Sequence, residues 1–514
     1  MKIRTRFAPS PTGFLHIGGL RSALYSFLFA KHFKNLGHDS EYIFRIEDTD
    51  IKRHIEEGIS ALVKGQEWVG IIPGFSNPEW WNAQVFQQKK PDGSFISYRQ
   101  SEKFSQIAQI AEELVKRKLA YYDYHTSEEL EKLREEKETK KQTPRFHLSE
   151  EEIKKHYEWA KKENRVNKII RLKMPENRNF EWNDMIRGKM IVPSDSLTDP
   201  VLLKSDGIPM YNLAVVYDDY IMEITHITRA EEHLSNTPYQ IAIREAIEPI
   251  LLEQGFSKNN EPFYAHLPIV IGSDGKKLSK RNKTLLQFVC GEKGQDYISL
   301  GYFPDAIRNF VVLLGWTTKD NKEILSLEEM IERFDGTRIV KAPAFFDIKK
   351  MNWLSGEYFK NMSESSYLEF VKPFININLS FTKLPDLALL TFKKQISCAF
   401  ELNNLVKETF IDLDFSQIDQ ILNQNSISKE DYEKCVSCFL TILKEYEQIT
   451  IENTDEIINK VKTQSGFKGK TLFMPIRLYA IGKEHGPEMN KILPVIGKEN
   501  LLNKSFKNQV KINE

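Results

Sequence analysis

The chain has 514 residues, of which 41% are hydrophobic and 28% are charged, a composition that excludes disordered and fibrous proteins and leaves room for several domains. Its 72 basic and 72 acidic side chains cancel, so the total charge does not mark a nucleic-acid-binding protein, although charges can still gather on one face. Four cysteines are too few for a disulfide scaffold, and no apolar run approaches the roughly 20 residues of a membrane span, which predicts a cytoplasmic protein without membrane contact.

The first predicted elements form a strand–helix–strand unit. Residues 3–7 alternate between apolar and polar side chains, and a Pro- and Gly-rich loop leads from them to a helix with a wide apolar face over residues 20–33. A second strand over residues 42–46 ends in the acidic turn 47–50. Such a unit predicts parallel strands, and ligands of parallel sheets bind beyond the carboxyl ends of the strands. We therefore expect a site formed by the loop and the acidic turn.

Further along the chain, a helix is predicted over residues 101–118. Capping-box sequences at residues 126–129 and 149–152 predict two more helices, the first of them with a charged, solvated face. Apolar patterning over residues 201–216 and 220–227 predicts strands.

The composition changes beyond about residue 351. Leu, Ile, Lys, Glu and Asn recur there at helical spacing, which predicts an all-helical second half. Within it, Cys435 and Cys438 have the spacing of a metal-binding pair, but no second pair and no neighbouring histidine accompany them. We interpret these two cysteines as structural.

The loop after the first strand contains a candidate phosphate site, because His16, Gly18 and Gly19 stand at the start of a predicted helix. A helix N-terminus offers unpaired N–H groups, glycines let a phosphate approach the backbone, and an imidazole can donate a hydrogen bond to a phosphoryl oxygen. The alternative, a glycine-containing turn beside a surface histidine, stays open on these residues alone.

A second candidate phosphate site is a basic loop far downstream. Ser273-Asp274-Gly275 predicts a turn, and Lys276, Lys277, Lys280 and Arg281 follow it. Such a loop could clamp the β- and γ-phosphates of a nucleotide, with Mg²⁺ sharing that work. The alternative is a solvated basic hairpin tip.

Arg6, Glu47, Tyr211 and Arg229 are candidates for binding a small acidic molecule. Arg6 ends the first strand and Glu47 follows the second, so both could face one crevice. A carboxylate could hold a substrate ammonium group, and two guanidinium groups could hold substrate carboxylates. The alternative is an ordinary ion pair between Arg6 and Glu47.

These loops and several further segments resemble bacterial-type glutamyl-tRNA synthetases, which are class I aminoacyl-tRNA synthetases. His16-Ile17-Gly18-Gly19 is similar to the class signature His-Ile-Gly-His, and Lys277-Leu278-Ser279-Lys280-Arg281 is similar to Lys-Met-Ser-Lys-Ser. The resemblance covers nearly the whole chain and includes residues 4–13, 45–50, 201–207, 211–219, 224–234, 313–316 and 482–488.

The resemblance implies an α/β fold in which a Rossmann-type parallel-sheet catalytic domain carries an inserted acceptor-end α/β domain and is followed by an α-helical C-terminal half. The implied domains are a catalytic domain over residues 1–108 and 212–268, an insertion over residues 109–211, a stem-contact domain with the lysine loop over residues 269–350, and a helical anticodon-binding domain over residues 351–514.

The implied activity is that of a glutamate–tRNA ligase. Glutamate would react with ATP, accompanied by Mg²⁺, to give glutamyl-adenylate, and the glutamyl group would then pass to the terminal adenosine of tRNA(Glu). By this resemblance the glutamate site consists of Arg6, Ala8, Ser10, Glu47, Tyr211 and Arg229. The ATP site consists of His16, Gly19, Glu232, His233 and Lys280, and the catalytic residues are His16, Gly18, Gly19, Lys277 and Lys280.

The sequence also departs from the family pattern. Zinc-binding members have Cys-x-Cys where this chain has Asp123-Tyr124-His125, so the resemblance does not support a structural zinc, and we predict no metal ligands, leaving open whether any metal binds near Asp123. Gly19, Leu278 and Arg281 differ from the general class signatures but are usual in this family.

Three rival functions fit the sequence less well. A glutaminyl-tRNA synthetase is disfavoured by residues 45–50 and by the helical second half, because that enzyme typically has β-barrel anticodon domains. A truncated tRNA-modifying paralogue is disfavoured by the length of the second half. A non-catalytic tRNA-binding protein is disfavoured by the two intact nucleotide loops. We expect a monomer, and the sequence leaves open whether tRNA(Gln) is also charged.

Overall fold

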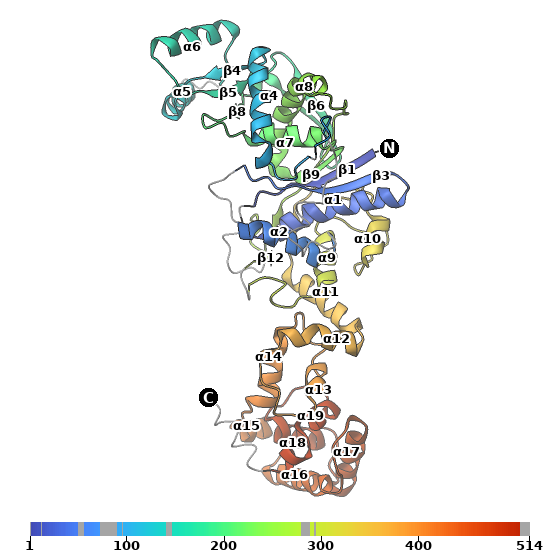
Figure 1. Cartoon of the computed structure of the whole chain (residues 1–514). Coiled ribbons are helices and arrows are strands. Elements are labelled where there is room, and N and C mark those ends of the chain that lie inside the picture. Colours follow the sequence, from blue (N-terminus) through green and yellow to red (C-terminus); the bar gives the residue numbers. More distant parts are fainter. Residues whose placement is uncertain are drawn as a thin grey trace. The chain divides into compact units, whose positions relative to one another are not determined.

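The computed structural model describes residues 2–11, 13–49, 56–71, 90–94, 96–139, 146–278, 288–291 and 295–503 (Figure 1). The chain divides into two compact units. Unit 1 consists of residues 1–298 and 307–347, and unit 2 consists of residues 299–306 and 348–514.

A six-stranded sheet forms the centre of unit 1, with the strand order β3-β1-β9-β10-β6-β7. The strands are β1 (Lys2–Phe7), β3 (Asp39–Phe44), β9 (His226–Ala230), β10 (Phe263–Leu267), β6 (Asn179–Asp184) and β7 (Gly188–Pro193). Neighbours are parallel from β3 to β6, and only β7 is antiparallel to its neighbour. The carboxyl ends of β1, β3, β9 and β10 therefore share one edge, as the strand–helix–strand prediction required.

Helices cover both faces of this sheet (Figure 1). The helices are α1 (Ile17–Asn35) on one face and α7 (Tyr211–Ile221) and α8 (Thr237–Glu253) on the other. Successive strand side chains point to opposite faces, so Thr5 of β1 donates a hydrogen bond to the Ser26 carbonyl of α1 at 2.8 Å, whereas Arg6 reaches Asp219 of α7.

The prediction of strands over residues 201–216 and 220–227 is only partly right. Within the two segments, only β8 (Val201–Leu203) and the start of β9 are strands, and α7 occupies residues 211–216 and 220–221. Residues 213–221 of α7 are all buried. A helix buried on every side has no polar face to reveal its 3.6-residue period, so its sequence looks like that of a buried strand.

A second, antiparallel sheet lies among the inserted elements and has the order β4-β5-β8. The elements of this region are β4 (Ala120–Asp123), β5 (Ile169–Leu172), η2 (Ser101–Lys103), α4 (Phe104–Lys116), α5 (Ser127–Thr139), α6 (Glu150–Lys162) and η3 (Ser194–Ser196). Both capping boxes are confirmed. Ser149 caps α6 reciprocally with Glu152, and the Glu129 N–H donates to Thr126 Oγ1 at 3.2 Å at the start of α5.

The remaining elements of unit 1 are short. They are β2 (Leu15–His16), α2 (Glu56–Trp68), η4 (Glu231–Asn236), β11 (Val270–Ile271), β12 (Phe288–Cys290), α9 (Pro304–Val312, shared with unit 2), α10 (Leu327–Arg333) and β13 (Ala344–Phe345). β11 pairs with β13 and β12 pairs with β2. The predicted turn at residues 273–275 is confirmed, since Gly275 has φ +70° and the Lys276 N–H donates to Asp274 Oδ1 at 3.0 Å.

Every regular element in the described residues of unit 2 is a helix, as predicted. Its helices are α11 (Ile348–Asn361), α12 (Glu364–Val371), η5 (Lys372–Phe374), α13 (Pro385–Leu390), α14 (Glu401–Val406), η6 (Lys407–Ile411), α15 (Ile418–Gln424), α16 (Lys429–Leu443), α17 (Ile451–Ser465), α18 (Lys470–Ile481), α19 (Met489–Ile496) and α20 (Lys498–Leu502). Cys435 and Cys438 lie on α16, where their thiols contact the carbonyls of Leu472 and Val461. Among the described residues, no helix of either unit is both long and apolar enough to span a membrane.

Two helix-ending glycines of unit 2 make a matched test of backbone strain. Gly482 and Gly466 both end helices with positive φ, at +71° and +77°. A side chain in this left-handed region costs roughly 1–2 kcal/mol at either position. At Gly482 a Cβ atom would also lie 2.2 Å from the Asp414 carbonyl oxygen, whereas at Gly466 it would meet no atom within 4 Å. We therefore expect Gly482→Ala to lower the melting temperature of unit 2 clearly more than Gly466→Ala does, measured by circular dichroism. Equal shifts would contradict the close contact with Asp414.

Candidate active site

A cavity of about 520 Å³ opens at the carboxyl edge of the large sheet, beside the start of α1. Lys276 of the basic loop does not line this cavity, but every described residue to which the family resemblance assigns a role does. These residues are Arg6, Ala8, Ser10, His16, Gly18, Gly19, Glu47, Tyr211, Arg229, Glu232, His233 and Lys277. Lys280 and Arg281 lie outside the described residues.

The loop after β1 continues along the chain that follows β3. The Arg45 N–H donates to the Phe7 carbonyl and the Glu47 N–H donates to the Pro9 carbonyl, each at 3.0 Å. These bonds prolong the β1–β3 pairing beyond the sheet and hold residues 8–10 beside Glu47. Ala8 and Ser10 are therefore positioned by backbone contacts, which sequence spacing alone could not reveal.

The start of α1 forms one end of the cavity. His16 is its N-cap residue, and His16 Nδ1 accepts the Gly19 N–H at 3.1 Å. Because Nδ1 is an acceptor, the hydrogen of the neutral ring is on Nε2. A Cβ atom at Gly18 would lie 3.1 Å from His16 Cε1, so glycine leaves space for the capping ring. This arrangement combines an imidazole donor with the positive end of a helix dipole.

Polar side chains from η4 lie at the same cavity. Lys277 donates a hydrogen bond to Glu232, and both side chains are about half exposed. An exposed ion pair of this kind is weak and can exchange partners. His233 Nδ1 lies 3.2 Å from the Tyr211 hydroxyl, and burial together with Arg229 lowers the pKa of His233 to about 4. The His233 ring is therefore neutral at pH 7.

Arg45 organises a buried charge cluster in the wall of the cavity. Its guanidinium is fully buried and donates to Asp219 Oδ1 at 2.8 Å and to Glu47 Oε1 at 3.1 Å. Arg6 Nε donates to Asp219 at 3.3 Å. The alternative of an Arg6–Glu47 ion pair is therefore wrong, because Arg6 pairs with Asp219 and Glu47 pairs with Arg45.

The charges of this cluster balance. Lys103 Nζ lies 3.4 Å from Asp218, and the cluster holds three cations and three carboxylates, namely Arg6, Arg45, Lys103, Glu47, Asp218 and Asp219. Burial raises the pKa of Glu47 and of Asp218. Burial also acts on Asp219, but Arg6 and Arg45 outweigh it and lower the pKa of Asp219.

Sequence reasoning gave no role to four of these residues, Arg45, Lys103, Asp218 and Asp219. Two adjacent acids inside the otherwise apolar segment 211–221 were the available signal, because buried carboxylates require buried cations.

Arg229 on β9 differs from the other buried arginines of the cavity. Its Nε donates to His266 Nε2 at 3.0 Å, and its terminal nitrogens donate to Gln240 Oε1 at 2.6 Å and Thr237 Oγ1 at 2.9 Å. All three acceptors are uncharged, and within the described part of the chain no carboxylate forms an ion pair with Arg229. The guanidinium is only 5% exposed. A buried cation without a carboxylate partner is a candidate site for an anionic ligand.

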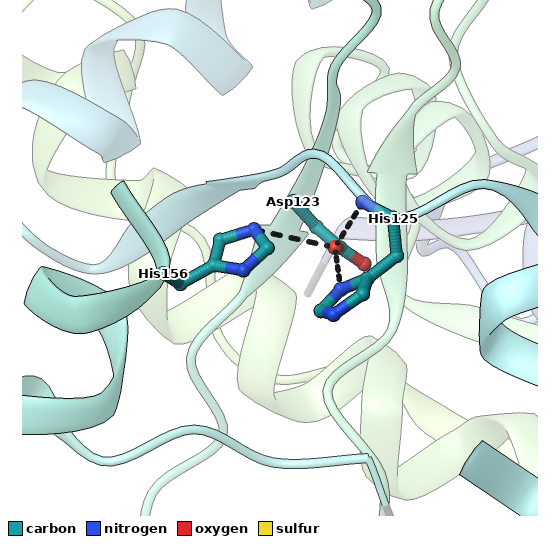
Figure 2. Close-up of side chains that lie close together, drawn as sticks. All are labelled: Asp123, His125 and His156. Carbon is teal, nitrogen blue, oxygen red and sulfur yellow. Dashed lines mark hydrogen bonds and ion pairs between the residues drawn. The ribbon is translucent and has the colours of Figure 1, made fainter. Parts of the chain in front are cut away.

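Asp123, His125 and His156 form the one group of potential metal ligands among the described residues (Figure 2). Each of these three side chains already forms a hydrogen bond at an atom that could bind a metal. Asp123 Oδ1 accepts His125 Nδ1–H at 2.7 Å, Asp123 Oδ2 accepts Arg171 Nε–H at 2.6 Å, and His156 Nε2 accepts the Tyr124 N–H at 3.0 Å. A structural zinc would have to replace these bonds, so these residues do not fit one.

Comparison with known proteins gives consistent results. The family described as "tRNA synthetases class I (E and Q), catalytic domain" matches residues 2–353, and the family described as "Anticodon binding domain" matches residues 365–504. The chain is similar to a glutamate–tRNA ligase of Malacoplasma penetrans (42% identity) and to one of Ureaplasma urealyticum (43% identity), with 98% of each chain covered in both cases.

A solved structure is similar over its whole length. It is a crystal structure of a glutamate tRNA ligase from Elizabethkingia meningosepticum in complex with its amino acid, with a TM-score of 0.80, 30% identity and full coverage of both chains.

The buried cluster predicts a large effect of removing its central cation. In Arg45→Met, three carboxylates lose a buried partner, and we expect unfolding free energy to fall by about 3–5 kcal/mol. Arg117 makes partly exposed ion pairs with Glu113 and Glu253, so Arg117→Met should cost no more than about 1 kcal/mol. Denaturant titration of both variants checks this difference, and comparable losses would show that the cluster does not stabilise the fold.

Proposed function

The chain belongs to the class I tRNA synthetases for glutamate and glutamine, and we propose that the cavity of unit 1 binds L-glutamate and ATP side by side. Its activity is that of a glutamate–tRNA ligase, since full-length relatives and solved structures carry that name. The reaction forms AMP, pyrophosphate and an aminoacyl-tRNA. The proposals below concern which residues do this and which tRNA is used.

Arg229 is the observation that carries the glutamate site. A substrate carboxylate would give this buried guanidinium the anionic partner that the protein leaves out. Glu47, held by Arg45, would receive the substrate ammonium group, with Arg6 and Tyr211 completing the wall. Glutamine would offer a neutral amide to Arg229 and would leave the buried guanidinium without a direct anionic partner, which is a basis for rejecting glutamine. Ala8 and Ser10 would contact the amino acid from the loop after β1.

His16, Gly18 and Gly19 are proposed to bind the ATP phosphates, with Glu232 and His233 also at the nucleotide. His16 Nε2–H and the N-terminus of α1 suit the charge that develops at the α-phosphate, and Lys277 and Lys280 suit the departing pyrophosphate. Mg²⁺ would be held mainly by phosphate oxygens and water.

The chemistry needs two displacements. A glutamate α-carboxylate oxygen attacks the α-phosphorus and pyrophosphate leaves, and then a hydroxyl of the terminal tRNA adenosine attacks the glutamyl carbonyl and AMP leaves. No side chain needs to form a covalent intermediate, because positioning and charge stabilisation suffice.

The tRNA partner is proposed to be tRNA(Glu). Unit 2 has a hollow lined by residues of α18 and the following loop, including Lys470, Phe473, Arg477 and His485. Phe473 is exposed, and an exposed aromatic ring among cationic side chains suits an unstacked anticodon base. Charging of tRNA(Gln) would require that this surface accept its anticodon as well.

We also propose the domain division over residues 1–108 with 212–268, 109–211, 269–350 and 351–514. The β4-β5-β8 sheet and the helical character of unit 2 support it, while β6 and β7 of the insertion extend the large sheet. A monomer is also proposed, as the family resemblance led us to expect, and a cytoplasmic location is proposed because all four cysteines are free thiols.

Arg229→Gln tests the glutamate site. Without the cation, the glutamate KM in tRNA aminoacylation should rise at least about tenfold, because one charge-assisted contact is worth more than about 1.4 kcal/mol. Arg244→Gln is the control, since Arg244 is also buried but donates to backbone carbonyls away from the cavity. Assays use labelled glutamate and glutamine with tRNA(Glu) and tRNA(Gln). An unchanged glutamate KM would remove Arg229 from the site.

The buried carboxyl group of Glu47 predicts that glutamate binding depends on pH. Burial raises its pKa, so as pH falls Glu47 takes up a proton at a higher pH than an ordinary glutamate and loses its attraction for the substrate ammonium group. Glutamate KM should therefore increase as the assay pH is lowered from neutral into the acidic range. Glu47→Gln should have a high KM that changes less over this range. Parallel pH profiles for the two proteins would exclude Glu47 as the titrating group.

A further inference from the structure

Two buried polar residues lie behind Arg229 and do not line the cavity. Asp184 ends β6 and is 3% exposed, and His266 lies on the neighbouring strand β10 and is fully buried. His266 Nδ1 and Asp184 Oδ2 are 2.5 Å apart, and the other ring nitrogen of His266 contacts Arg229. Hydrogen bonds connect these three side chains in a row that leads from the interior of the sheet to the cavity.

The hydrogen bonds fix the tautomer of His266. Arg229 Nε can only donate, so His266 Nε2 must accept, and the ring hydrogen is therefore on Nδ1. From there it is donated to Asp184 Oδ2. The Thr237 hydroxyl, 3.3 Å from Nε2, is also compatible with an accepting nitrogen. Burial lowers the pKa of His266, so the ring is neutral at pH 7.

Asp184 is the negatively charged member of this group of three side chains. Burial would favour its neutral form, but the bonds from His266 and from the N–H groups of Arg187 and Ile186, at 2.8 and 3.0 Å, outweigh burial and lower the pKa of Asp184. An ionised carboxylate thus faces a neutral imidazole, which in turn faces the Arg229 guanidinium. The charge of Arg229 is balanced by Asp184 on the far side of His266 rather than by a carboxylate in direct contact.

We propose that Asp184 and His266 are positioning residues that hold Arg229 for the substrate carboxylate and supply its counter-charge from outside the cavity. A carboxylate in direct contact would occupy the N–H groups that a substrate needs. With His266, Gln240 and Thr237 as acceptors, one bond is made at each nitrogen of the guanidinium. Each terminal nitrogen then keeps a second N–H for a bidentate ligand. This inference rests on the proposed role of Arg229 in glutamate binding.

Asp184→Asn is the direct test, because it keeps the size of the side chain and an oxygen for the backbone N–H groups. Its amide would donate to His266 Nδ1, which moves the ring hydrogen to Nε2 and places two donors against each other at Arg229. In aminoacylation with the full chain, glutamate KM should rise at least about tenfold, while kcat and the KM for ATP stay within about threefold.

His266→Gln provides the rescue. A glutamine carbonyl can take the position of Nε2 and accept from Arg229 whatever stands at residue 184. We therefore expect the double variant Asp184→Asn/His266→Gln to have a lower glutamate KM than Asp184→Asn alone. His226→Gln is the control, since His226 is buried on β9 and bonds to Thr225 instead of Arg229, and its glutamate KM should stay within about twofold of the wild type.

Several outcomes separate this inference from the proposal beneath it. A normal glutamate KM in Asp184→Asn, combined with a raised KM in Arg229→Gln, would overturn the positioning role and leave the glutamate site standing. A normal KM in both variants would overturn both. Losses in Asp184→Asn spread equally over kcat and both KM values, or a double variant worse than the single one, would show a merely structural role and overturn the inference.

A measurement on the unaltered protein covers the case in which Asp184→Asn does not fold. In ¹⁵N-histidine-labelled wild-type chain, the His266 signals are assigned by their absence in His266→Gln. A neutral ring protonated on Nδ1 supports the inference, and a ring protonated on Nε2 overturns it.

Discussion

The buried guanidinium of Arg45 is the contact on which the arrangement of the cavity depends. Arg45 joins the segment after β3 to α7 through Asp219, and it also holds Glu47, which lies two residues further along its own segment. Arg45 pairs with Glu47, and Asp219 pairs with Arg6. Glu47 and Arg6, which both line the cavity, are therefore held in place without forming an ion pair with each other. Removing one member would leave an unpaired charge at low dielectric, so the cluster is constrained as a whole.

The charge of Arg229 is balanced in a different way from the charge of Arg45. The Arg45 cluster balances its charges by direct ion pairs, whereas Arg229 is surrounded by neutral acceptors and has its counter-charge at Asp184, behind His266. A glutamate–tRNA ligase must bind a substrate with two carboxylates and one ammonium group. A cavity with one satisfied carboxylate and one guanidinium lacking a direct partner is complementary to that charge pattern.

The proposed nucleotide end of the cavity depends on the backbone more than on charge. The His16 cap, the absent side chain at Gly18 and the start of α1 bring donors to one place, and the Lys277 side chain forms an exposed ion pair with Glu232. In the insertion, too, the protein's own hydrogen bonds hold the polar groups, because Arg171 and backbone N–H groups are the partners of Asp123, His125 and His156.

The sequence by itself determined the parallel strand–helix–strand unit, both capping boxes, the helical second half and the family, because these signals lie in neighbouring residues and in short motifs. It also named twelve of the residues that line the cavity. It misread α7 because a fully buried helix has no polar face. Only the tertiary structure decided that Arg45 pairs with Asp219, 174 residues away, and that His266 stands between Asp184 and Arg229. Such pairings depend on which strands become neighbours, and no local pattern of charge or hydrophobicity encodes them.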